Sequence, residues 1–299
     1  MKKIFCVLAA LALLCGGALA EKALEFGGDI YLIAAEAGGS ALVRFHGGER
    51  PLLAERGEIK DLAVFNGDLY YLRLNRRSWE MVCRNSSGGA HVSHVFPEGS
   101  MVGGLSVYGE NLFALIDGRL HIIYPDQDIC LKLAGAVMDE YVISDNCAYF
   151  ISAADRTRYS AEYPGGEAAR EAGGVYRLNL TTGETAPVLK SGAYDLSYAA
   201  GKLYFHSLAE GYVAASDDFA EMCGRLCSWD PATGAVVQEW PDYDWGYLAT
   251  QSGPAIRNAD GLWLGGKQIA KLSDTDEIFM INGSIAAYDP LNVTIEILN

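Results

Sequence analysis

Short apolar segments alternate with polar turns along almost the whole chain, and one phrase recurs. In this phrase a turn of Gly, Asn or Asp is followed by an apolar and aromatic segment. The clear copies are NGDLYYL at 66–72, GENLFAL at 109–115, DNCAYFI at 145–151 and GKLYFH at 201–206, with looser copies at 28–32 and 260–264. Apolar segments joined by tight turns of this composition predict β-hairpins, and helical periodicity is nearly absent after the first 20 residues.

A second phrase follows the first. It reads VYRLNLTTGE at 175–184 and LCSWDPATG at 226–234, where Asp, Pro and Gly supply the chemistry of a tight turn. Each repeating unit therefore contains two hairpins. Units of about 40 residues with four strands predict a β-propeller. We expect six blades; seven blades, with an incomplete last blade completed from the other terminus, is the alternative. A two-sheet sandwich would not explain the repeated phrase.

The first 20 residues differ from the rest. Lys2 and Lys3 precede an apolar run at 4–14, and Ala-Leu-Ala ends the segment at 18–20. This pattern predicts a secretory signal peptide over 1–20 and a single propeller domain over 21–299. A lipoprotein signal that uses Cys15 is disfavoured, because Leu14 stands where a small residue is expected. The mature protein has no further long apolar run, so we expect no transmembrane segment in it.

Composition limits the partners. The chain has 23 Lys and Arg against 38 Asp and Glu, a formal net charge of −15. Because neutralising phosphates requires basic residues, this acidic protein is not expected to bind nucleic acid. Together with the signal peptide, the composition predicts a protein that is secreted or held in the cell envelope.

Five cysteines remain after the predicted signal peptide, namely Cys83, Cys130, Cys147, Cys223 and Cys227. An odd number at irregular spacing does not predict a disulfide framework. Cys223 and Cys227 are close enough in sequence to form a disulfide in an oxidising compartment. The alternative is that both are small buried apolar residues.

The repeated phrases carry a resemblance. The N-G-x-L-Y-Y turn and strand at 66–71, followed by V-Y-R-L and T-G-E at 175–184, resemble secreted bacterial propellers of the low-density-lipoprotein-receptor-related-like kind. They are also similar to the repeats of TolB-type propellers. The resemblance covers the whole mature chain and implies a role in binding or scaffolding. It transfers no functional residue, because the shared phrase is a turn rather than a site.

Catalytic motifs are missing from the sequence. There is no G-x-S-x-G elbow and no H-E-x-x-H motif, and the five histidines are interpreted as surface or packed residues. We therefore expect no cofactor. Calcium is a lesser alternative, because the D-x-D pairs at 242–244 and 274–276 are of the kind that supplies oxygen ligands.

The longest insertions predict where a ligand would bind. Segments 152–173, 207–223 and 241–254 all fall in connections that emerge on one face of a propeller, and long loops in compact domains are often functional. Their aromatic, acidic and basic side chains suit sugar stacking or protein contact. The predicted ligand-binding residues are Arg156, Arg158, Tyr159, Asp217, Phe219, Tyr243, Asp244 and Trp245.

The sequence thus favours a non-catalytic binding or scaffold module that contacts an extracellular or envelope protein, peptide or glycan. The alternative is a propeller hydrolase or lyase that acts on an extracellular polymer, with Asp155, Asp217 or Asp244 as the acids. A third hypothesis is a structural envelope subunit in which the aromatic side chains only pack the loops onto the strands.

Overall fold

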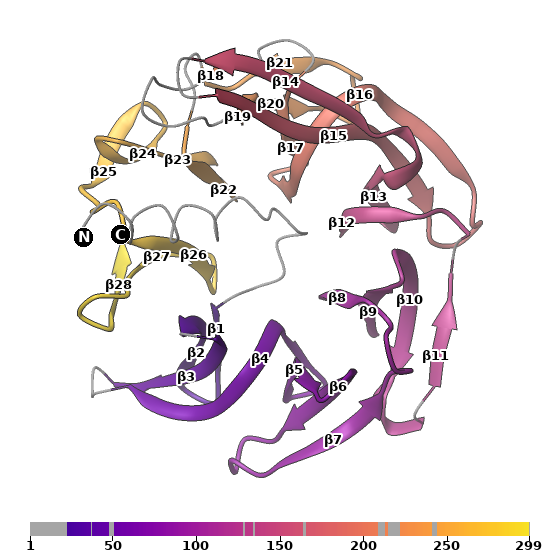
Figure 1. Cartoon of the computed structure of the whole chain (residues 1–299), viewed down its shortest axis with the longest axis vertical. Helices are drawn as coiled ribbons and strands as arrows, with labels where there is room; N and C mark the ends of the chain where they lie inside the picture. The colour runs from indigo at the N-terminus through magenta and orange to yellow at the C-terminus, as the bar shows by residue number, and fades with distance from the viewer. Residues whose placement is uncertain are drawn as a thin grey trace.

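The protein is an almost entirely β-stranded ring (Figure 1). The computed structural model describes residues 23–36, 38–47, 51–127, 129–133, 135–163, 166–208, 213–214, 222–240 and 244–298. These residues contain no α-helix and two short 3₁₀ turns, η1 (Pro125–Gln127) and η2 (Ala153–Asp155). Accordingly, the described part of the chain has no helix that is long and apolar enough to cross a membrane.

Seven antiparallel units make up the described strands. Unit one comprises β1 (Ala23–Phe26), β2 (Asp29–Glu36), β3 (Gly39–His46) and the first half of β4 (Leu52–Phe65). Unit two takes the second half of β4 together with β5 (Asp68–Asn75), β6 (Ser78–Arg84) and β7 (Ala90–Val95). One continuous strand therefore serves as the outer strand of unit one and the inner strand of unit two.

Unit three is regular, and the next two units again share a strand. Unit three comprises β8 (Val102–Tyr108), β9 (Asn111–Ile116), β10 (Arg119–Tyr124) and β11 (Ile129–Lys132). Unit four comprises β12 (Met138–Ser144), β13 (Cys147–Ser152), β15 (Gly166–Asn179) and the first half of β16 (Thr185–Ala199). Unit five takes the second half of β16 with β17 (Lys202–Ser207), β20 (Arg225–Trp229) and β21 (Val236–Gln238).

The last two units complete the ring. Unit six comprises β22 (Gly246–Thr250), β23 (Gly253–Asn258), β24 (Gly261–Leu264) and β25 (Lys267–Ala270). Unit seven has three described strands, β26 (Glu277–Ile281), β27 (Ser284–Asp289) and β28 (Thr294–Leu298). Two further pairs lie in insertions, namely β14 (Thr157–Tyr163) against β15, and β18 (Val213–Ala214) against β19 (Met222–Cys223).

The recurring phrase of the sequence forms the turn between the first two strands of a unit. At Asn66-Gly67, Asp145-Asn146, Ala200-Gly201 and Asn282-Gly283 both central residues have positive φ angles. A two-residue hairpin of this type needs positive φ at both positions, which explains why Asn, Asp and Gly recur there. These turns lie at one end of the units, which we call the turn face. The inner strands begin and the second strands end at the other end, the loop-bearing face.

Neighbouring units pack face to face through apolar side chains, and this packing closes the ring. Each junction has its own buried cluster, from units one and two around to units six and seven. The first and last units meet in the same way, with Phe45 against Tyr288 and with Phe279 and Ile281 in the same cluster. Asn282 also donates a hydrogen bond to Glu25. Side chains, rather than a described strand exchange, thus join the two ends of the chain.

Polar links also join the inner strands. The register of β4 and of β8 is interrupted at Asp61 and at Gly104, and both residues have positive φ angles of 57° and 66°. Such a bulge turns a backbone group sideways, toward the next unit. The Asp61 carboxylate accepts a hydrogen bond from the Gly104 N–H at 2.6 Å, and the Tyr141 hydroxyl donates to the Gly104 carbonyl at 2.5 Å.

The same arrangement recurs two units further on. β16 is interrupted at Asp195, whose φ angle is 57°. The Glu140 carboxyl accepts a hydrogen bond from the Leu196 N–H at 3.3 Å, and the Tyr247 hydroxyl donates to the Asp195 carbonyl at 2.5 Å. An acid from the preceding unit and a tyrosine from the following unit therefore hold each of these two bulges.

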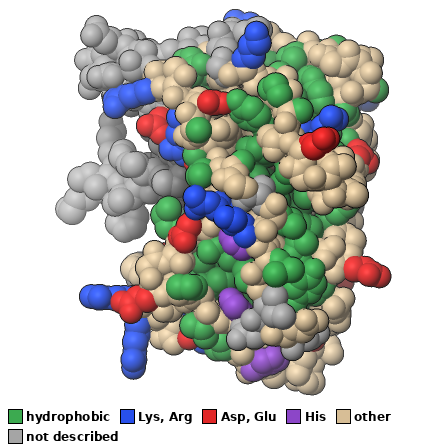
Figure 2. All heavy atoms as spheres, turned by 90° about the vertical axis from the view of Figure 1, so that its right-hand side faces the viewer, with side chains coloured by type: hydrophobic (Ala, Val, Ile, Leu, Met, Phe, Trp, Pro, Cys, Tyr) green, Lys and Arg blue, Asp and Glu red, His purple; other side chains and the backbone are tan. Residues whose placement is uncertain are grey.

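The outer wall is mixed in character. Figure 2, which views the right-hand side of Figure 1, shows hydrophobic side chains scattered among polar and charged ones. Exposed Val92 and Val95 on β7 and Leu131 on β11 contribute large apolar side chains to the outermost strands.

The structure confirms the predicted all-β propeller class. The described strands group into seven units, of which the last has three described strands, and the number of blades, six expected with seven as the alternative, stays a prediction. The sequence copy at 260–264 is the turn between the second and third strands of unit six, whereas Asn282-Gly283 is the inner turn of unit seven. The predicted signal peptide, 1–20, lies outside the described residues, so the domain boundary stays a prediction.

If side-chain packing closes the ring, Phe279→Ala will lower the free energy of unfolding by about 3–5 kcal/mol, the cost of emptying a packed core site. Phe279 is 8% exposed, whereas Leu291 in the same unit is 76% exposed, so Leu291→Ala is the matched control and should change little. Urea denaturation measures both. Equal, small effects of the two substitutions would show that the packing between units one and seven contributes little to stability.

Candidate functional site

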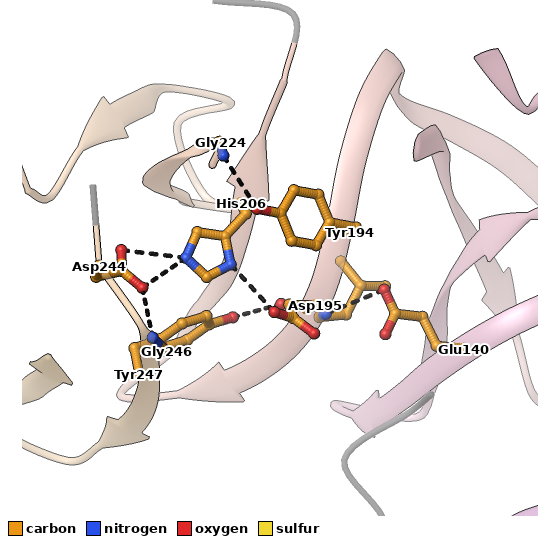
Figure 3. A network of polar contacts seen from close by, with 9 residues as sticks. Glu140, Tyr194, Asp195, His206, Gly224, Asp244, Gly246 and Tyr247 are labelled. Atoms are coloured by element: carbon orange, nitrogen blue, oxygen red, sulfur yellow. Dashed lines mark hydrogen bonds and ion pairs between the residues drawn. The ribbon is translucent and has the colours of Figure 1, made fainter. Parts of the chain in front are cut away.

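A buried polar network lies at the loop-bearing ends of units four, five and six (Figure 3). Its centre is His206, the residue before the last in β17, which is 4% exposed. His206 is the register partner of Tyr194 on β16, so the two rings stack at 4.9 Å between centroids. The Tyr247 ring meets the same imidazole edge-on at 5.2 Å.

Two carboxylates hold the imidazole of His206. Its Nε2 lies 2.9 Å from Oδ1 of Asp244, and its Nδ1 lies 3.2 Å from Oδ2 of Asp195. The Asp244 side chain is itself fully buried and also accepts the Gly246 N–H at 2.9 Å. With an acid on each ring nitrogen, both nitrogens act as donors, which is the protonated form of histidine.

The charges around His206 outweigh the effect of its burial. Burial alone would lower the pKa of His206, but Tyr194, Asp244 and Asp195 together raise it well above the ordinary value. A histidine between two carboxylates therefore stays charged under conditions where a free histidine is mostly neutral.

Glu140 is the second buried acid of the network. It is 3% exposed and lies on β12 of unit four. One oxygen, Oε1, accepts the Leu196 N–H, but Oε2 is buried with no hydrogen-bond partner. Burial and the nearby charge of Asp195 raise the pKa of Glu140 well above its ordinary value. A buried carboxyl oxygen without a protein partner costs free energy unless a water or a ligand completes its hydrogen bonds.

Glu140 opens into a small recess of about 60 Å³. Strands β12, β13, β15 and β16 supply its walls, and its polar lining comes from Asp139, Glu140, Arg156, Glu171 and Tyr194. Its remaining walls are the small or apolar residues Ile151, Ala172, Gly173 and Ala193. The volume suits a few waters or one small chemical group. The recess adjoins the His206 network, because Tyr194 belongs to both.

Three of the predicted ligand-binding residues lie together beside this recess. Arg156 directly precedes β14 and donates to Asp139 and, at 2.7 Å, to Glu171. Arg158 and Tyr159 follow on β14, where Arg158 is the register partner of Glu171 and is exposed. Arg156 and Glu171 line the recess, so the hairpin of β14 and β15, which carries Arg158 and Tyr159, lies next to it.

The other predicted residues lie elsewhere or are not described. Asp244 is buried against His206 and is not available at the surface. Trp245 is 38% exposed, and the guanidinium of Arg257 lies 5.7 Å from its ring centroid. Asp217, Phe219 and Tyr243 lie outside the described residues, so their predicted roles stay predictions.

The candidate acids of the hydrolase alternative have structural contacts. The Tyr176 hydroxyl donates to the carboxylate of Asp155, and the Asp244 carboxylate is enclosed. In the D-x-D pair at 274–276 the Asp276 carboxylate accepts from Ser273, while the Asp274 carbonyl accepts from Arg257. Asp242 lies outside the described residues, so the calcium alternative stays untested.

The predicted disulfide also remains a prediction. Cys227 lies buried in the cluster between units four and five, with Phe205 and Leu203. The side chain of Cys223 lies outside the described residues.

Sequence reasoning missed Glu140, Tyr194, Asp195 and His206. Each lies in a strand segment with an ordinary alternation of apolar and polar residues, and no sequence motif indicates the bulge at Asp195. The one available signal was positional. Glu140 and Asp195 lie at the same distance before a recurring turn, namely Asp145-Asn146 and Ala200-Gly201, as Asp61 does before Asn66-Gly67.

Comparisons with known proteins support the fold. No protein-family model matches this chain, and no curated protein matches it in sequence. Among solved structures it is similar to TolB from Acinetobacter baumannii, with a TM-score of 0.51 and 14% identity over 91% of this chain and 64% of that one. It is also similar to the β-propeller domain of the Trilobed protease from Pyrococcus furiosus, with a TM-score of 0.57 and 10% identity over 92% and 89% of the two chains.

These similarities show a TolB-like β-propeller fold. At such identities they extend to the fold alone, and this chain spans less than two thirds of the TolB chain. The likeness to low-density-lipoprotein-receptor-related-like propellers stays a prediction.

The His206 network predicts a pH-dependent stability. Because the folded pKa of His206 is raised, its contribution is complete below the ordinary value of about 6.5 and is lost as the pH rises through the folded value. His206→Gln will lower the free energy of unfolding at pH 6 by about 3–5 kcal/mol, the cost of leaving a buried charge without its partner. The deficit will shrink at higher pH.

Urea unfolding measured at a series of pH values from pH 6 upward tests this dependence. His91→Gln, at an exposed histidine of β7, is the control and should follow the wild type throughout. A deficit for His206→Gln that does not vary with pH would mean that packing, not charge, explains it.

The pH dependence that Glu140 predicts has the same sign, but its substitution should stabilise the protein rather than destabilise it. Since its folded pKa is raised, the wild type loses stability as the pH rises above the ordinary carboxyl value of about 4.3. Glu140→Gln removes this loss and keeps an oxygen for the Leu196 N–H. At pH 8 the variant should be more stable by about 1–3 kcal/mol, because a neutral amide replaces a buried carboxylate. Denaturation at pH 4 and pH 8 measures this gain, and a variant destabilised at both values would contradict it.

Proposed function

We propose that this protein is a non-catalytic binding module that acts outside the cytoplasm and takes a protein, peptide or glycan on its loop-bearing face. The unpartnered Oε2 of Glu140, buried at the end of the recess, carries the proposal. An acid retained in a position that lowers stability is typical of a functional site, because stability there is exchanged for function.

The surroundings of the recess support a binding role. The β14–β15 hairpin is an insertion beyond the four strands of unit four, and it carries Arg158 opposite Glu171, which lines the recess, with Tyr159 next in sequence. Exposed arginine together with tyrosine suits contact with a large ligand. The recess itself is too small for a polymer unit, so it would receive one group of a ligand that lies mostly against the hairpin.

Rigid positioning also supports this role. Asp195, Asp244 and Tyr194 fix His206, and the Tyr194 hydroxyl accepts the Gly224 N–H at 3.0 Å. We propose that Asp244 serves the site by holding this network rather than by touching the ligand. The predicted leader at 1–20 supports an extracytoplasmic location.

The melting temperature of the purified protein, measured against panels of peptides, glycans and envelope proteins, tests this function. A ligand present at 100 times its dissociation constant adds about 2.7 kcal/mol, which is a measurable shift. We expect one class of ligand to raise the melting temperature, and Arg158→Ala to reduce that shift by more than half.

Arg76→Ala is the matched control. Arg76 is exposed at the turn after β5, on the same face but in unit two, so its loss should leave the shift unchanged. Equal losses in both variants would indicate non-specific charge attraction. The absence of a shift with every panel would overturn the binding function.

A further inference from the structure

We propose that the recess beside Glu140 binds a primary ammonium group of the ligand, with Glu140 Oε2 as its acceptor. This inference rests on the proposed function and specifies the chemistry of its ligand. It starts from two independent observations, namely a cavity of about 60 Å³ and a buried carboxyl oxygen in its wall that has no hydrogen-bond partner.

The charges of the recess favour a cation. Three acids line it, and the single basic residue in its lining, Arg156, already pairs with Asp139 and Glu171. Glu140 is the acid that this arginine does not reach. An anion that entered the recess would meet three carboxyl groups. A cation would instead supply the hydrogen-bond partner that Glu140 lacks.

The size of the recess favours ammonium over guanidinium. An ammonium group is compact and has three donors, whereas a guanidinium is a planar fork that needs a wider slot. The small residues Ala172, Gly173 and Ala193 leave room for one carbon beside the nitrogen. Tyr194 also lines the recess, and its ring stacks on His206.

Binding would be linked to a proton. Burial and Asp195 raise the pKa of Glu140, so Glu140 would give up a proton when a cation binds. Arg156, Asp139, Glu171 and Tyr194 also face the recess, and His206 lies behind Tyr194. Affinity should therefore rise with pH until the amine of the ligand itself loses its proton.

Isothermal titration with matched probes tests the inference. The probes are a lysine-free peptide amide with a free amino terminus, its N-acetylated copy, the acetylated peptide with one lysine, and glucosamine beside N-acetylglucosamine. We expect at least one free amine to bind at least tenfold more tightly than its acetylated copy. The amine that does so identifies the source of the ammonium group, whether amino terminus, lysine or amino sugar.

Glu140→Gln should weaken binding of that amine at least tenfold, or about 1.4 kcal/mol. Glu110→Gln is the matched control, since Glu110 is exposed at a turn on the opposite face and its loss should change nothing. Titration in two buffers with different ionisation enthalpies should show proton release in the wild type and none in Glu140→Gln.

The inference and the proposed function fail differently. Acetylated and free probes that bind equally well, with binding still sensitive to Arg158→Ala, would overturn the ammonium assignment and leave the binding module standing. If no amine binds at millimolar concentration, the assignment is also overturned. The panels of proteins, peptides and glycans then decide the binding function separately.

Discussion

The hydrogen bonds between neighbouring inner strands fix the geometry on which the candidate site depends. Face-to-face apolar packing holds the units together but tolerates sliding, because dispersion contacts have little direction. The Asp61 contact with Gly104 and the Glu140 contact with Leu196 are directional. Since each ends on a bulged residue of the next unit, they set the angular position of one unit against another. The tyrosines at 141 and 247 complete these links from the other side.

Glu140 makes one of these links between neighbouring units, but its side chain differs from that of Asp61. At the first bulge Asp61 lies with its carboxylate against two backbone N–H groups, those of Gly104 and Leu105. Glu140 has a longer side chain at the corresponding place, and its second oxygen reaches past the backbone into the recess. The two acids thus differ by one methylene group. The Asp61 carboxylate only links two strands, whereas the Glu140 carboxyl also presents an acceptor oxygen to the recess. The site is a modification of a repeated structural contact.

Much of the fold was predictable from sequence, and the reasons are local. The positive φ angles at Asn66 and Gly67 require residues that tolerate them, so the hairpin turns are visible as a repeated phrase. The number of units was harder to predict, because the inner turn of unit six lacks that phrase and reads Thr250-Gln251-Ser252-Gly253. The inner turn of unit seven, Asn282-Gly283, was not among the copies recognised in the sequence. A strand shared by two units, as in β4 and β16, also removes the loop that would mark a boundary.

The site was only partly predictable. Long insertions are visible in sequence, so the segment with Arg156, Arg158 and Tyr159 was singled out, and the binding role of these residues stays a prediction. The role of Glu140 depends on which unit lies beside it and on a bulge in β16, and neither is encoded in a local pattern. His206 illustrates the same limit, since its two carboxylates come from β16 and from the segment before β22.

The shared strand β16 has a mechanical consequence. Its first half pairs with β15, which carries the hairpin beside the recess, and its second half carries Tyr194 and Asp195 of the His206 network. No connecting loop lies between the two halves to act as a hinge. A ligand that presses on the hairpin therefore meets a surface braced by unit five through a continuous backbone. If the hairpin receives a ligand as proposed, little entropy is lost in ordering the protein, and selectivity rests on a shape that is already formed.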